Sequence, residues 1–140
     1  MVTREEQEQG SKLKDYALAL EIGVVQIPFY LLADPWHHGL AKALPIVAIL
    51  FLCFGAVAGG LSPTRSWVMG LLVATPLWVL VGPAAAVMST TEELLRLDLP
   101  LMISALACAL AGSLFGGVLA GRKRGAGSGK SEGETDTKLP

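Results

Sequence analysis

Long apolar stretches alternate with short polar segments along the chain. Four stretches of 18 to 23 residues show no strand-like alternation of apolar and polar positions (residues 16–33, 39–61, 67–88 and 99–120). A hydrocarbon layer about 30 Å thick requires ~20 apolar residues in an α-helix. The pattern therefore predicts an all-α membrane protein with four transmembrane helices.

The segments between these stretches predict how the helices follow one another. Residues 34–38 and 62–66 form links of five residues each, which favour antiparallel neighbours and hence two tandem hairpins. The third link, residues 89–98, is longer. It contains Thr90 and Glu93 at the spacing of a capping box, followed by three leucines. For this link we expect one or two helical turns at the outer membrane interface.

Both ends of the chain are polar. Residues 1–15 carry four acidic and three basic side chains. A signal peptide has a net positive start and a small-residue cleavage site, and neither feature is convincing here. We therefore interpret residues 1–15 as a cytoplasmic segment and the apolar stretch after them as a retained helix. Residues 121–140 contain mainly Gly, Ser, Lys, Glu and Thr without an apolar period, which predicts a disordered cytoplasmic tail.

The composition agrees with a membrane location. The chain is 52% hydrophobic and 16% charged, against about 25% charged in an average soluble domain. Only Glu21 and Lys42 are charged within the four apolar stretches. The net charge of −1 provides no electrostatic footprint for nucleic acid. The predicted environment is a lipid bilayer, without a nucleic-acid partner.

The distribution of basic residues predicts the orientation. One side of the predicted topology holds nine Lys and Arg residues, whereas the other holds Lys42 and Arg96. Because basic loops stay in the cytoplasm, both termini are expected there. The expected membrane is a bacterial cytoplasmic membrane.

The two halves of the chain resemble each other. The pattern Pro-x-aromatic-x-Leu-x-x-Pro occurs at residues 28–35 and again at 76–83, and Gly-x-x-x-Gly-Gly occurs at residues 55–60 and 112–117. The order of these motifs predicts a parallel internal repeat about an axis along the membrane normal. The alternative is a chance match between two apolar segments.

Repeated small residues suggest how the helices pack. The glycines that share a helix face within the second and fourth spans are Gly55, Gly59, Gly112 and Gly116. Glycines one turn apart let helix backbones approach closely in lipid. We expect these two helices to cross at the centre of the bundle; alternatively, one of them forms a dimer face. Pro28 and Pro76 predict kinks that either open a cavity or simply shape the bundle.

Glu21 and Gln26 are candidate functional residues within the first span. An ionisable side chain inside a span suggests a proton or substrate site. The alternative is that Glu21 lies near the cytoplasmic interface and reaches water or Arg65.

Asp34, His37 and His38 form an incomplete metal site, so no metal is predicted. No phosphate-binding loop or nucleophile motif occurs, so we expect no catalytic residues, no enzyme activity and no cofactor.

The outline of four short helices, with Glu21-Ile22-Gly23 in the first, resembles the small multidrug transporters. In that family a membrane carboxylate exchanges protons for a lipophilic cation. The strong Lys and Arg bias and the third span, beginning at Trp67, differ from the family pattern, and the chain is not assigned to it.

The sequence favours a non-enzymatic accessory, scaffold or oligomer-forming role, as a homo-oligomer or with a membrane-complex partner. The alternative is a proton-linked small transporter or channel that works as an oligomer.

Overall fold

The computed structural model describes residues 4–32 and 40–128, and these residues are almost entirely helical. Four helical segments are long and apolar enough to cross a membrane: Arg4–Leu32, Leu40–Leu61, Pro63–Met88 and Thr91–Ala126. The predicted all-helical class with four candidate spans is thereby confirmed. The predicted link at residues 34–38, with Asp34, His37 and His38, lies outside the described residues. Of the predicted tail, residues 121–140, the part from 129 onward lies outside them too, whereas residues 121–128 are helical.

Two of the spans are single helices and two are composite. The first is α1 (Arg4–Leu32) and the second is α3 (Leu40–Leu61). The third begins with a 3-10 turn, η1, and contains a π-helical segment, η2, between α4 and α5 (Pro63–Arg65, Ser66–Pro76, Leu77–Val81 and Gly82–Met88). The fourth consists of α6, the π-helical η3 and α7 (Thr91–Glu93, Leu94–Asp98 and Leu99–Ser128).

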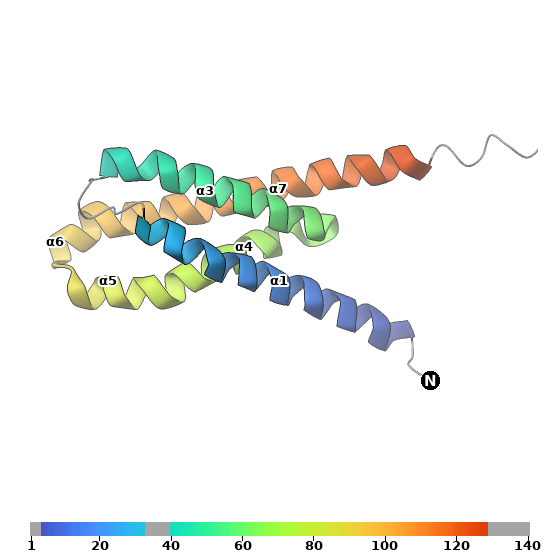
Figure 1. Ribbon diagram of the computed structural model, residues 1–140, viewed down its shortest axis with the longest axis horizontal. Helices are drawn as coiled ribbons and strands as arrows, with labels where there is room; N and C mark the ends of the chain where they lie inside the picture. Colours follow the sequence, from blue (N-terminus) through green and yellow to red (C-terminus); the bar gives the residue numbers. More distant parts are fainter. Residues whose placement is uncertain (1–3, 33–39, 129–140) are drawn as a thin grey trace, which may run out of the picture.

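Successive spans run in opposite directions (Figure 1). The beginning of α1 and the end of α7 lie at one end of the bundle, and α6 and the beginning of α3 lie at the other (Figure 1). The main contact of α3 is with α7, whereas α4 contacts α1, α3 and α7. The helix pair α3–α7 and the helix α4 therefore form the centre of the molecule.

Each span buries one stripe of its surface. In α1 the buried residues are Ala19, Gly23, Gln26 and Tyr30, spaced three or four residues apart as on one face of an α-helix. Many of the buried positions in the bundle are Ala or Gly, whereas large apolar side chains such as Val25 point outward. Small residues inside and large apolar residues outside are typical of helices that pack in lipid.

The fourth span begins earlier than its apolar stretch. Thr90 Oγ1 accepts a hydrogen bond from the backbone N–H of Glu93 at 3.4 Å, and Glu93 Oε2 accepts one from the N–H of Thr90 at 3.1 Å. The predicted capping box is confirmed. The sequence predicted separate interfacial turns at residues 89–98. In the structure Thr91–Asp98 instead continues into α7 through the π-helical η3, and Pro100 lies within this helical run.

Candidate functional site

The four glycines singled out from the sequence lie in the contact between α3 and α7. A Cβ atom on Gly59 would overlap the carbonyl group of Ser113, and a Cβ atom on Gly116 would overlap that of Ala56. Gly55 and Gly112 approach backbone of the facing helix in the same way. The two helix backbones therefore touch at positions where any side chain would force them apart.

The two predicted kinks differ in their surroundings. Pro28 lies inside α1 and is exposed, whereas Pro76 is buried at the end of α4 and is followed by the π-helical segment η2. Proline lacks the amide hydrogen that would bond the carbonyl four residues earlier, so Pro76 interrupts the regular hydrogen-bond ladder. The backbone N–H of Leu77 bonds the carbonyl of Ala74, three residues earlier.

Gln26 binds directly to this irregular backbone. Its side-chain Nε2 donates a hydrogen bond to the carbonyl of Val73 at 2.6 Å, from a fully buried position. Side chains of neighbouring helices commonly bond the backbone groups that a proline kink leaves over in membrane helices. Its Oε1 atom is buried without a hydrogen-bond partner among the described residues. Gln26 thus joins α1 to α4 and still presents one free acceptor inside the bundle.

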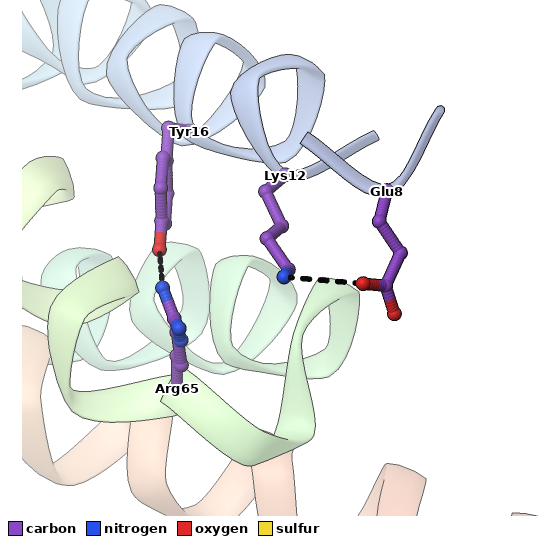
Figure 2. Close-up of polar contacts among 4 residues, drawn as sticks. All are labelled: Glu8, Lys12, Tyr16 and Arg65. Atoms are coloured by element: carbon purple, nitrogen blue, oxygen red, sulfur yellow. Dashed lines mark hydrogen bonds and ion pairs between the residues drawn. The ribbon is translucent and has the colours of Figure 1, made fainter. Parts of the chain in front are cut away.

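Glu21 does not share a site with Gln26. Its side chain is exposed on the outside of the bundle, whereas Gln26 faces α4. Arg65, the alternative partner of Glu21, donates a hydrogen bond from Nη1 to the hydroxyl of Tyr16 at 2.8 Å (Figure 2). No hydrogen bond or ion pair joins Glu21 to another described residue. The two candidate residues therefore lie on different faces of α1.

A second polar cluster lies near the end of the bundle that holds α6. Asp98 is 1% exposed, and its Oδ2 accepts a hydrogen bond from Ser89 Oγ at 2.8 Å. Its Oδ1 has no partner among the described residues. Tyr30 of α1 is also fully buried. The structure thus buries the carboxyl group of Asp98, on the fourth span, beside the end of the third span.

Asp98 is not among the candidates predicted from the sequence, because the apolar stretch of the fourth span begins only at residue 99. The confirmed cap at Thr90 starts that helix at Thr91. From there, Asp98 precedes Leu101, Met102 and Ala105 by three, four and seven residues, and all three are buried. This spacing defines one helix face. Extending the helix from the capping box would have identified Asp98 as a core residue.

A cavity of about 1040 Å³ lies beside this cluster, between α1, η2–α5 and α6–η3. Its apolar wall includes Ile27, Leu31, Leu80, Val81, Ala84, Ala85, Met88 and Leu97. Its polar rim consists of Ser89, Thr90, Glu92, Glu93 and Arg96. Because Ser89 both lines the cavity and bonds Asp98, the buried carboxylate lies directly behind the rim.

No protein-family model, curated protein or solved structure matches this chain. The four apolar helices indicate an integral, multi-pass membrane protein. Such helices are compatible with several roles, and the surfaces and polar groups of the bundle distinguish among them.

Proposed function

We propose that the chain is a non-enzymatic accessory, scaffold or oligomer-forming subunit in a membrane, and that the outward face of α1 around Glu21 is its contact surface. The observation that carries the proposal is the exposure of Glu21 on the outside of the bundle. Glu21 lies seven residues beyond Lys14, about 10 Å deeper along the helix. Ionisable residues within membrane spans almost always face protein or a water-filled cavity. Another protein chain that covers this face would keep Glu21 away from lipid.

A second copy of this chain is the partner to test first. A two-fold axis along the membrane normal places the two Glu21 carboxyl groups at the same depth, where each can find a hydrogen-bond partner on the other copy. The neighbours of Glu21 on the same helix face, Ala17, Val24 and Pro28, are exposed and of small or moderate size. They allow a second helix to approach closely.

The test is self-association of the purified protein in liposomes, measured by single-molecule subunit counting at several protein densities. Glu21→Leu is expected to weaken association about tenfold, because it removes a side-chain hydrogen bond within the membrane. Glu21→Gln keeps this capacity and should associate as the unchanged protein does. Thr75→Val, which removes an exposed polar group from α4, serves as the matched control. A Glu21→Leu variant that associates normally would contradict the assignment of this face as the contact surface, and a wild-type protein that stays monomeric would contradict self-association.

We also propose that both termini are cytoplasmic and that the membrane is a bacterial cytoplasmic membrane. Nine of the 11 Lys and Arg residues fall on the proposed cytoplasmic side, in agreement with the positive-inside rule. The beginning of α1 and the end of α7 lie at the same end of the bundle, which is compatible with this orientation (Figure 1).

A parallel internal repeat of two hairpins is part of the same proposal. A Cβ atom on Gly55 would meet Ala109 of the facing helix, and a Cβ atom on Gly112 would meet Leu52. Gly112 lies 57 residues after Gly55, and Ala109 lies 57 residues after Leu52. The other two glycines repeat the relation at the same offset. Reciprocal contacts of this kind are expected where two copies of one element meet across a two-fold axis, which supports a duplication.

A proton-linked small transporter or channel, working as an oligomer, is the second candidate. It is favoured by the free acceptor atoms of Gln26 and Asp98, which are buried without partners among the described residues. Such groups mark substrate or ion pathways in membrane proteins. Asp98→Asn separates the two candidates, because it should preserve assembly through the face around Glu21 but abolish pH-dependent flux in a transporter that uses the buried carboxyl group of Asp98.

A further inference from the structure

The cavity at the α6 end of the bundle is polar at one end and apolar along its wall. The wall on the third span runs from Leu80 to Met88, a rise of about 12 Å. The rim lies at the start of the fourth span, where a membrane-spanning bundle meets the headgroup layer. A cavity of about 1040 Å³ lies at the upper end of the usual size range of small-molecule sites. Its shape and polarity therefore fit an amphiphile with a polar head at the rim and an apolar chain along the wall.

The charges at the rim of the cavity determine which polar headgroup of an amphiphile can bind there. Arg96 Nη2 forms an ion pair with Glu92 Oε1 at 3.2 Å. Glu93 receives both bonds from Thr90, from the N–H and the hydroxyl, on the same atom, Oε2. No hydrogen bond to another described residue occupies Glu93 Oε1. With two carboxylates and one guanidinium, the rim has a net charge of −1, and the buried Asp98 lies behind it.

We propose that this cavity binds a phospholipid with a primary-ammonium headgroup from the leaflet at the α6 end. The lipid phosphate pairs with the guanidinium of Arg96, and the ammonium donates hydrogen bonds to the carboxylate of Glu93. A choline headgroup lacks N–H donors. An anionic headgroup without an amine brings negative charge towards two carboxylates. One acyl chain covers the apolar wall. This site is separate from the outward face around Glu21 and does not depend on assembly.

The experiment is native mass spectrometry of the full-length protein in mild detergent with equal amounts of three phospholipids of identical chains. The headgroups are ethanolamine, choline and glycerol. The ethanolamine lipid is expected to form the most abundant one-to-one complex, about tenfold above the glycerol lipid, because hydrogen bonds to charged groups are among the stronger ones. An excess of phosphoethanolamine without acyl chains should not displace it, since it lacks the part that covers the wall.

Two variants probe the rim and the wall separately. Replacing Glu92 and Glu93 with Gln changes the rim charge from −1 to +1 and keeps a residue that can complete the capping box. This double variant should reverse the preference towards the glycerol lipid. Ala84→Trp fills the cavity from an exposed position and should lower binding of all three lipids. Replacing Arg122 and Lys123 with Gln at the far end of α7 is the matched charge control and should change nothing.

The proposal is overturned if the three lipids bind equally, or if the double Gln variant retains the original order. It is also overturned if the lipophilic cation tetraphenylphosphonium binds in a manner blocked by Ala84→Trp while the ethanolamine lipid does not compete with it. The cavity would then be a site for a small cation instead of a phospholipid.

Discussion

Gln26 is a polar side chain that the bundle buries completely, and its neighbours explain why. Its amide donates to the carbonyl of Val73, three residues before the buried Pro76, where the backbone departs from regular α-helical bonding. A buried carbonyl without a donor costs free energy, and lipid provides no water to replace it. Gln26 therefore stabilises the contact of α1 with α4 at the kink of the third span.

Replacing Gln26 with Leu keeps a side chain of similar size but removes this donor. The free energy of unfolding is expected to fall by about 1 kcal/mol, in the range of hydrogen bonds between membrane helices. The measurement is reversible unfolding in mixed micelles by a denaturing detergent. Val118→Leu, on the exposed side of α7, should leave stability unchanged. Equal stability of Gln26→Leu and the unchanged protein would show that the bond to Val73 contributes nothing.

Single polar residues within apolar stretches could be recognised from the sequence, but their direction could not. Glu21 and Gln26 are five residues apart, which on a helix of 100° per residue places them about 140° apart. The sequence identifies both as polar residues within an apolar stretch, and their spacing shows that they cannot share one helix face. Which of the two is buried depends on the stripe that α1 presents to α4, and this stripe is set by the contacts of Gly23 with Val73 and Pro76.

At the scale of elements, the packing of α3 against α7 depends on the absence of side chains. Gly59 and Gly60 are adjacent but differ in their surroundings. A Cβ atom on Gly59 would overlap the carbonyl of Ser113, whereas the nearest atom to a Cβ on Gly60 is the carbonyl oxygen of Gly116, at 4.0 Å. Substitutions at these two neighbouring glycines therefore distinguish the effect of close packing from the effect of helix propensity.

Gly59→Ala is expected to destabilise the bundle by about 1 to 3 kcal/mol, because the helices must move apart to accept the methyl group. Gly60→Ala is expected to be neutral or slightly stabilising, since Ala has the higher helix propensity. Thermal unfolding in one detergent compares the two variants directly. The account of the α3–α7 contact fails if both substitutions have the same effect.

The positions of the four spans could be predicted because the bilayer fixes the length of an apolar helix. The ends of the helices could not, since a helix that leaves the membrane no longer needs apolar residues. Accordingly, α1 begins at Arg4 and α7 continues to Ser128, each several residues beyond its apolar stretch. The early start of the fourth span, and with it the burial of Asp98, follows from the cap at Thr90.

At the scale of the whole molecule, the orientation of the bundle in the membrane decides which surface Glu21 and the cavity each lie near. If both termini are cytoplasmic, Glu21 lies in the cytoplasmic half of α1, and the cavity with Glu93 and Arg96 opens at the opposite surface. The wide outer surface of exposed apolar side chains is compatible with contact to lipid on most sides. The contact surface and the lipid site are therefore assigned to different halves of the bilayer.

Cysteine accessibility in intact cells tests this arrangement most directly. With Cys53 and Cys108 replaced by Ala, one cysteine is introduced at Thr91 at the start of α6, or at Gly125 near the end of α7. A membrane-impermeant maleimide is expected to label Thr91→Cys in intact cells and Gly125→Cys only after lysis. Labelling of Gly125→Cys in intact cells, or equal labelling of both positions before lysis, would contradict the four-span topology with cytoplasmic termini.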